Sequence, residues 1–305
     1  MIKSIKVTNP KGESLVLDLF HPEKSGLIVK SITGLGPPKA NINSTDLATA
    51  DGALYSSARA STRNIVFNLQ FMFAPTIEDS RQLTYRYFPL KKLVKIEVET
   101  DNRSLETTGY VESNSPDIFS KEESTQISIL CLDPFFYDPI PTVTQFGSVT
   151  PEFEFPFCDD SIAEDALPTL EMGRINLDTR AILDYAGDVD TGIIITIHGL
   201  GEVSGIVTVY NIETQENMAI DLAKIKTLIG KDFGSGDDII ISTISGDKYV
   251  QVLHDGKYTN TISAIEKSAD WFQISVGKNL FNFTVTTGVD NLSMSFSYRN
   301  AYGGI

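Results

Sequence analysis

Residues 27–74 read LIVKSITGLGPPKANINSTDLATADGALYSSARASTRNIVFNLQFMFA, two apolar runs separated by a long polar segment. Alternate residues of the second run are apolar, and they are Ile65, Phe67, Leu69, Phe71 and Phe73. A period of two is typical of a β-strand, and it places these side chains on one face. We therefore expect this run to be a strand with one face in a hydrophobic core.

The polar segment before that strand extends from Gly34 to about Ala60 and is expected to be a loop. Pro37 and Pro38 donate no backbone hydrogen bond, and the glycines of the segment favour turns, so we expect no regular hydrogen-bond ladder. Loops of this length are uncommon in compact domains and usually serve in binding. The segment is therefore a candidate binding loop.

Short strands dominate the rest of the first 140 residues. Apolar alternation and turn residues predict them at 2–8, 13–19, 27–32, 93–100, 103–113 and 124–132. The pattern changes at 76–88, where an apolar stripe and a capping sequence that begins at Thr76 predict a helix, which Pro89 ends. The first domain is therefore expected to be mainly β, with one α-helix and an N-terminal β-hairpin.

Length and turn spacing predict two domains, because a chain of 305 residues exceeds one ordinary core. Prolines are frequent from Pro139 to Pro168. Turn signals then recur about every 8–12 residues, which is typical of a β-sandwich or jelly roll. We expect an N-terminal domain at 1–139, a Pro-rich exchange segment at 140–168 and a C-terminal β-sandwich at 169–305.

The charge is unevenly distributed along the chain. Residues 1–140 carry 15 Lys and Arg against 17 Asp and Glu, and the remaining residues carry 10 against 23, so the formal charges are −2 and −13. An acidic second part argues against nucleic-acid binding, since phosphate contacts require Lys and Arg. No apolar run approaches the roughly 18 residues that span a bilayer. The N-terminus alternates like a strand, so we expect neither membrane insertion nor a signal peptide.

The sequence contains no recognisable catalytic or metal-binding motif. His21, His198 and His254 are far apart and have no neighbour at metal-ligand spacing. Cys131 and Cys158 do not make a disulfide framework, and Cys131 is expected to be a buried free thiol. We therefore expect no enzymatic activity, no cofactor and no resident metal.

Two features of the second part leave alternatives open. Acidic turns at 184–190 and 237–238 could bind calcium through carboxylate oxygens, but neither matches the twelve-residue calcium loop, and a solvated turn is the alternative. Trp271, the single tryptophan, would either stack on a sugar, as exposed aromatic residues do in lectin-like sandwiches, or pack in the core beside Phe272.

Several segments share their pattern with one known family. They are the N-terminal hairpin, the segment ITGLGPPKANINSTDLATADGALYSSARASTRNIVFNLQF, the helix TIEDSRQLTYRYFPLKK and the closing CLDPFFYDP. The C-terminal stretch SADWFQISVGKNLFNFTVTTGVDNLSMSFSYRNAYGGI adds a W-F pair, a V-G-x-N turn and a final Arg-Asn-x-Tyr-Gly. With these features the chain resembles, over nearly its whole length, the distal tail protein (Dit) family of long-tailed bacteriophages.

The resemblance implies a structural role. In that family the first domain is a β-sandwich-like "belt" that assembles as a hexameric ring, and the ring joins the major tail tube protein to the tail-tip hub or tail-associated protein. The second domain is a galectin-like or carbohydrate-module-like sandwich that often docks receptor-binding proteins. The resemblance therefore implies a homohexamer in the baseplate of a virion tail tip, assembled in the host cytoplasm and serving host adsorption.

A ring requires two different complementary surfaces on each subunit. A polar loop that leads into an edge strand can supply one of them by strand addition. Tyr55, Ser56, Arg59 and Arg63 lie where the loop enters the strand. We expect these residues to contact the neighbouring subunit, with an ordinary surface loop as the alternative.

Two other functions remain open from the sequence. A carbohydrate-binding module or adhesin would contact cell-wall glycans through the C-terminal sandwich, with Trp271 as the ligand or partner contact. A glycan hydrolase would use a pair of carboxylates, and no pattern selects a pair among the 23 acidic residues of the second part. Oligomerisation, saturable cell-wall binding and sugar release distinguish the three functions.

Overall fold

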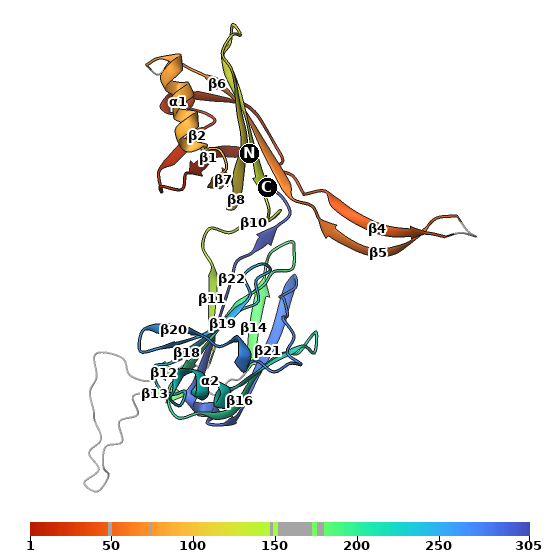
Figure 1. Ribbon diagram of the computed structural model, residues 1–305, viewed down its shortest axis with the longest axis vertical. Coiled ribbons are helices and arrows are strands. Elements are labelled where there is room, and N and C mark those ends of the chain that lie inside the picture. The colour runs from red at the N-terminus through yellow and green to blue at the C-terminus, as the bar shows by residue number, and fades with distance from the viewer. Residues whose placement is uncertain (48–50, 74, 147–148, 152–172, 176–179) are drawn as a thin grey trace, which may run out of the picture. The chain divides into compact units, whose positions relative to one another are not determined.

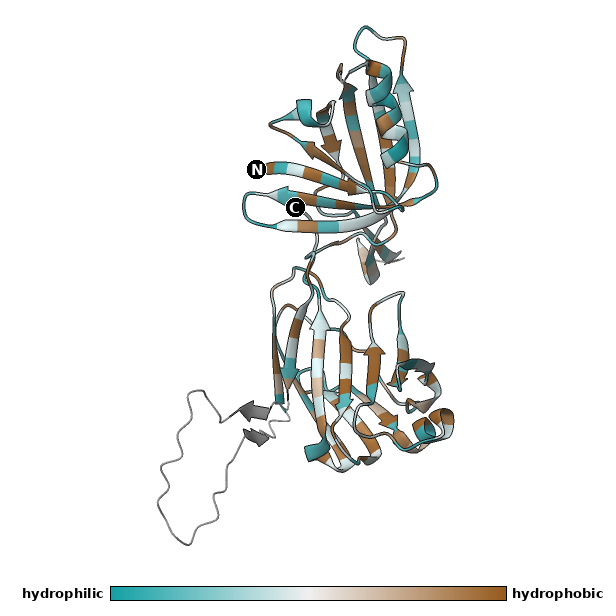
Figure 2. Ribbon diagram, turned by 90° about the vertical axis from the view of Figure 1, so that its left-hand side faces the viewer, coloured by the Kyte–Doolittle hydropathy of each residue, from teal (hydrophilic) through white to brown (hydrophobic). Residues whose placement is uncertain are grey.

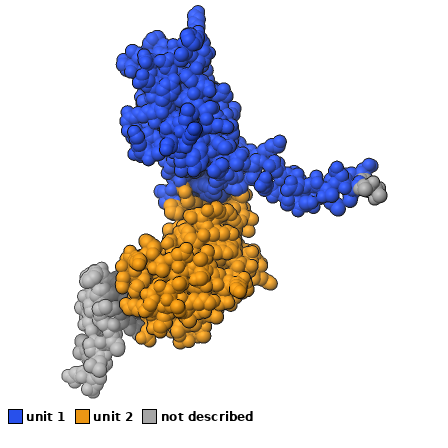
Figure 3. Space-filling model, viewed as in Figure 1, with its two compact units in different colours: residues 1–140, 300–305 blue, residues 141–299 orange. Residues whose placement is uncertain are grey.

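The computed structural model describes residues 1–47, 51–73, 75–146, 149–151, 173–175 and 180–305. The chain divides into two compact units, shown in Figure 3: a first unit of residues 1–140 and 300–305, and a second unit of residues 141–299. Most of the expected Pro-rich segment at 140–168, with Cys158, lies outside the described residues. The last six residues, expected in the C-terminal domain, pack instead with the first unit.

The first unit is built on one nine-stranded antiparallel sheet (Figure 1). Its main path has the order β2-β1-β7-β8-β9-β6-β3, and β10 and β23 pair beside it. The strands are β1 (Ile2–Thr8), β2 (Ser14–Asp18), β3 (Leu27–Thr33), β6 (Arg63–Phe71), β7 (Leu93–Thr100), β8 (Ser104–Asp117), β9 (Ser124–Cys131), β10 (Phe136–Tyr137) and β23 (Ala301–Tyr302). The end strands β2 and β3 come into contact with each other, so the sheet curls around a single core.

Alternation along β6 is as expected, up to the end of the strand. Ile65, Phe67 and Leu69 are fully buried and Phe71 nearly so. Phe73, expected on the same face, is 82% exposed because β6 ends at Phe71. Figure 2 shows the alternating hydrophobic and hydrophilic bands along the strands that this period produces.

The predicted helix forms as α1 (Ile77–Tyr87). The hydroxyl of Thr76 accepts a hydrogen bond from the backbone N–H of Asp79 at 3.2 Å, which is the expected N-cap. Ile77, Leu83 and Tyr87 pack against the core of the first unit. Cys131 is also in this core as a buried free thiol, as expected.

The prediction that residues 34–60 form a loop without a regular ladder is wrong. The segment forms an antiparallel hairpin of β4 (Ala40–Asp46) and β5 (Ala53–Ala60), which we call the arm. Pro37 and Pro38 precede β4 and therefore remove no donor from its ladder. Gly52 adopts a positive φ of 101° at the start of the returning strand, which glycine allows without a steric cost.

The second unit is a sandwich of two antiparallel sheets, as expected for this part of the chain. One sheet has the order β11-β22-β15-β18-β19-β20 and the other β14-β21-β16-β17. The strands are β11 (Thr142–Phe146), β14 (Arg180–Tyr185), β15 (Ile194–Gly199), β16 (Ser204–Asn211), β17 (Asn217–Asp221), β18 (Asp238–Ser242), β19 (Tyr249–His254), β20 (Lys257–Asn260), β21 (Gly277–Thr287) and β22 (Leu292–Tyr298). Side chains of both sheets share one core, including Ile195, Ile239, Leu183 and Phe281. Two short strands, β12 (Val149–Pro151) and β13 (Gly173–Ile175), pair with each other.

The second unit departs from the all-β expectation at one helix, α2 (Leu222–Ile229). The side chain of Asp221 caps it by accepting from the N–H of Ala223, and Gly230 ends it in the left-handed conformation. The apolar run at 272–276 forms no strand, and only a single bridge joins Thr191 and Ile274. Short 3-10 turns lie at Pro22–Lys24, Ile262–Ala264 and Val289–Asn291. Within the described ranges, no helix has the length and apolar character needed to cross a bilayer.

Candidate functional site: the arm and its root

The arm has no covering element within the described part of the chain. β4 and β5 pair with each other and with no other strand, and every residue of both strands is exposed. Figure 1 shows the hairpin projecting from the nine-stranded sheet. A lone two-stranded hairpin is at best marginally stable in water. The arm therefore presents two bare faces and two free strand edges for a partner to cover.

The two faces of the arm differ in chemistry. Residues paired across an antiparallel ladder share a face, and the register pairs Ala40 with Ala60 and Ile42 with Ala58. A bulge at Ser56 shifts the register, so Tyr55 pairs with Ser44 and lies on the same face as Ile42. We call this the apolar face; Ile42 and Tyr55 are 67% and 68% exposed on it.

The opposite face is polar near the root, and the exposed Leu54, paired with Thr45, lies on it towards the tip. Asn41 pairs with Arg59 and Asn43 with Ser57, and the amide of Asn43 donates to the hydroxyl of Ser57 at 2.9 Å. Three of the residues expected to contact a neighbouring subunit therefore lie on the exposed arm. Tyr55 is on the apolar face, Ser56 is at the bulge and Arg59 is on the polar face. Whether they make that contact stays a prediction.

Arg63, the fourth expected contact residue, differs from these three because it is buried in the first unit. Its side chain is at the start of β6 and only 3% of the residue is exposed. The guanidinium donates to four backbone carbonyls: Nε to Pro134 at 2.7 Å, Nη1 to Gly34 and Gly36 at 2.6 Å, and Nη2 to Gly303 at 2.6 Å. It also lies 4.4 Å from the ring centre of Phe136. Four of the five guanidinium N–H donors are thus bonded within the first unit and the residue is buried, so we omit Arg63 from the contact surface.

Arg63 holds the root of the arm, the segment 34–39 that leads from β3 into β4. Burial lowers the pKa of Arg63 from its ordinary value. Gly34 has a positive φ of 87°, and a Cβ there would lie 2.1 Å from the carbonyl oxygen of Asn64. Glycine is therefore required at this turn for steric reasons.

The C-terminal segment, residues 300–305, completes the root from the other end of the chain. β23 pairs with β10, and the N–H of Ile305 donates to the carbonyl of Leu35 at 3.1 Å. Arg103 donates to the carbonyl of Gly304 at 3.1 Å and lies over the ring of Tyr302 at 4.7 Å. Sequence reasoning missed this arrangement, because it depends on residues separated by more than two hundred positions.

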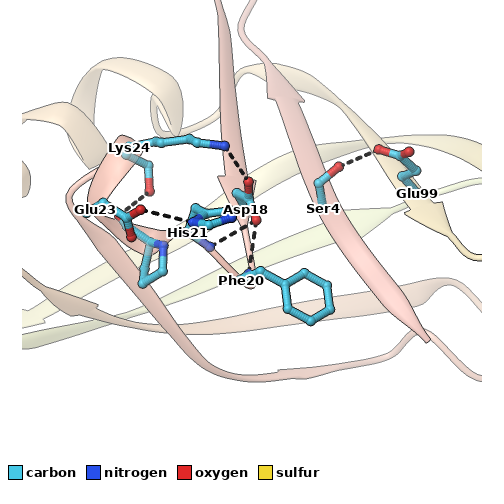
Figure 4. A network of polar contacts seen from close by, with 9 residues as sticks. Ser4, Asp18, Phe20, His21, Glu23, Lys24 and Glu99 are labelled. Atoms are coloured by element: carbon cyan, nitrogen blue, oxygen red, sulfur yellow. Dashed lines mark hydrogen bonds and ion pairs between the residues drawn. The ribbon is translucent and has the colours of Figure 1, made fainter.

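A second polar cluster lies at the free edge of β2, beside a shallow depression of about 530 Å³ lined in part by Val16 and Phe20. Figure 4 shows the Asp18 carboxylate bonded to the N–H groups of Phe20 and His21 and to Lys24, all at 3.0 Å. Lys24 and these backbone bonds lower the pKa of Asp18. His21 pairs with Glu23, and Ser4 donates to Glu99 (Figure 4). The Asp18, His21, Glu23 and Lys24 groups satisfy one another within the link between β2 and β3, and the Ser4–Glu99 bond joins β1 to β7, so the cluster is structural.

The candidate ligand contact Trp271 is half-buried in the second unit. Its ring packs against the sandwich core, and the ammonium of Lys248 lies 5.5 Å from the ring centre. The indole ring therefore packs partly on the core and also makes a cation–π contact with Lys248. Neither feature selects a sugar as its partner.

The histidines of the second unit pair with the acidic turn at 237–238. His254 Nδ1 lies 2.5 Å from Asp237, and His198 Nδ1 lies 2.7 Å from Asp238. His198 Nε2 is 3.4 Å from the hydroxyl of Ser295, which gives the atom order of a Ser-His-Asp hydrolase. However, the backbone N–H groups beside these residues belong to the ladders β22-β15-β18, so none is free as an oxyanion donor.

Across the described residues, no group of three or more His, Cys, Asp and Glu is arranged to hold a metal.

Solved structures with the same fold come from phage tails. The Dit (gp 19.1) protein of phage SPP1, described as a paradigm of the hub adsorption apparatus in Gram-positive infecting phages, matches with a TM-score of 0.62 at 13% identity, over 97% of this chain and 99% of that chain. A chain of the phage P2 baseplate in its activated conformation with Ca matches with a TM-score of 0.50 at 13% identity, over 98% of both chains. No family model and no curated protein sequence matches the chain.

These likenesses extend over both units and identify the class of fold. The chain has a mainly β, Dit-like fold of the kind found in phage hub and baseplate proteins. The resemblance expected from the sequence is thus confirmed at the level of the fold.

Proposed function

We propose that the protein is a structural component of a bacteriophage tail tip, a distal tail protein whose copies form a ring. The observation that supports this most is the match to the SPP1 Dit hub protein over nearly the whole length of both chains. In this proposal the ring has six copies and joins the tail tube to the tail-tip hub and to receptor-binding proteins. The protein would act in the virion, after assembly in the bacterial cytoplasm, and not as an enzyme.

The arm supplies the kind of surface that ring formation requires. A ring is built from a heterologous contact, in which one patch of each copy meets a different patch of the next. The arm's apolar face is bare within its own chain, and burial of Ile42 and Tyr55 on a second copy would remove apolar surface from water. We therefore place the arm at the contact between copies, with Arg59 on its polar face.

Charge favours contacts through the first unit. Residues 141–305 carry a formal charge of −13, whereas residues 1–140 carry −2. Like charges brought together repel, more strongly at low salt. Contacts between first units avoid most of this repulsion and leave the acidic sandwich for other tail proteins.

The experiment is light scattering of the purified chain, with negative-stain images of the same fraction. A six-subunit mass with ring-shaped particles is the expected result. The double variant Ile42→Ser/Tyr55→Ser should remain folded and become monomeric. The matched control Ile182→Ser/Tyr210→Ser makes the same two changes at exposed positions of the second unit, 59% and 38% exposed, and should still assemble. Assembly of the arm variant at wild-type concentration would overturn the role of the arm.

We do not carry the glycan-binding and hydrolase functions forward. Trp271 is half-buried on the core, which does not favour glycan binding. His198 has no free oxyanion donor beside it in the described sheet, which does not favour hydrolysis.

A further inference from the structure

One side chain joins the root of the arm to the end of the chain. Arg63 donates to Gly34 and Gly36, which lie in the root, and to Gly303, which lies in the C-terminal segment. The guanidinium is a planar fork whose donors have fixed directions. The root carbonyls and the C-terminal carbonyl must therefore be in place together for the fork to be satisfied.

The buried charge of Arg63 depends on these carbonyls. Within the described residues no carboxylate forms an ion pair with Arg63, and its hydrogen-bond acceptors are all backbone carbonyls. A buried cation is costly unless its donors are satisfied. Loss of the Gly303 carbonyl would leave Nη2 without its acceptor, and the least costly response is for the root to open and admit water.

The C-terminal segment contacts the root a second time, independently of Arg63. Ile305 donates to Leu35, and a Cβ on Gly304 would come within 3.0 Å of Gly36 and Pro37, so backbone packs directly on backbone there. The segment follows residues 141–299, the whole second unit, in the chain. It is therefore synthesised after residues 1–140 and after the whole second unit.

We propose that the C-terminal segment controls the arm: docking of residues 300–305 sets the root in its assembly-competent conformation, so that only a chain with a finished second unit joins the ring. The inference rests on the proposed role of the arm in assembly. It assigns the segment a regulatory function, in which the second unit, as it folds, delivers the residues that close the root.

The test compares the full chain with a chain that ends at Asn300 and with Arg63→Lys, which keeps the charge and loses the fork. Hydrogen exchange by mass spectrometry should show protection at residues 27–39 and 61–66 falling at least about tenfold in both, with β7 (residues 93–100) unchanged. The concentration for half-assembly should rise at least about tenfold. Arg86→Lys, in the same unit but bonded to Glu13 at the surface, is the matched control and should change neither quantity.

Each outcome decides the inference. Unchanged exchange at the root in either variant would overturn it, and so would equal loss of protection in β7, because the segment would then be a general part of the core. If the full chain forms no ring, the proposed function fails, while exchange at the root of the monomer still decides the coupling.

Discussion

Replacing Arg63 by methionine should destabilise the first unit and leave the second unit unchanged. Methionine retains an apolar stem of similar length and removes four donors from Pro134, Gly34, Gly36 and Gly303. A hydrogen bond to a charged group contributes about 1.5–3 kcal/mol. The sum over four bonds is an upper bound, because removing the cation also relieves its desolvation. We expect the free energy of unfolding of the first unit to fall by about 3–5 kcal/mol, a large part of the stability of a typical domain.

The assay uses the single tryptophan of the chain. Trp271 lies in the second unit, so its fluorescence follows unfolding of that unit alone, whereas far-UV circular dichroism follows both units. In a urea titration, Arg63→Met should move a circular-dichroism transition to lower urea and leave the fluorescence midpoint in place. A change below about 0.5 kcal/mol would refute the reasoning, since ordinary surface substitutions stay within that range. A shift of the fluorescence midpoint would show that the substitution acts beyond the first unit, contrary to the prediction.

Four further predictions concern three other sites. Ile42→Ser/Tyr55→Ser should leave the urea midpoints of the monomer unchanged while abolishing assembly in light scattering, because both side chains are exposed within their own chain; a destabilised monomer would show that the arm folds back. Burial raises the pKa of the Cys131 thiol to about 11, so the folded chain should resist iodoacetamide at pH 8 at this position, as mass mapping would show. A raised thiol pKa stabilises the fold below the ordinary value of 9.0 and loses that contribution as pH rises towards about 11, so Cys131→Ala should flatten the fall of first-unit stability in this window. Trp271→Ala should lower the stability of the second unit by about 2 kcal/mol in circular dichroism, because the half-buried ring packs on the core; unchanged stability with loss of cell-wall binding would restore the glycan-binding hypothesis.

The strands of the first unit were predictable from local sequence. β1 and β7 have the predicted bounds, and the helix begins after the predicted cap at Thr76. These elements are encoded by a period of two or by a cap, signals that lie within a few residues. α2 was not predicted, because its eight residues follow a strand directly and give a short apolar pattern that helix and strand share.

The arm shows where local reasoning fails. Residues of β4 and β5 are mostly Ala, Asn and Ser, and because Ala and Asn are depleted in strands the sequence predicts a loop there. The ladder forms by pairing across the turn, and its register, including the bulge at Ser56, decides that Tyr55 and Ile42 share a face. Alternation of Ala40 with Ile42, and of Ala58 with Ala60, was the signal that could have revealed the apolar face.

A mainly β chain in two parts, a capped helix, a buried Cys131 and an uneven charge can be predicted without the structure, because periodicity, capping and composition are local or additive properties. The place of residues 300–305 in the first unit and the burial of Arg63 emerge from the three-dimensional fold alone. Both depend on carbonyls contributed by segments far apart in the chain, and such convergence is fixed by strand register and chain return rather than by neighbouring residues.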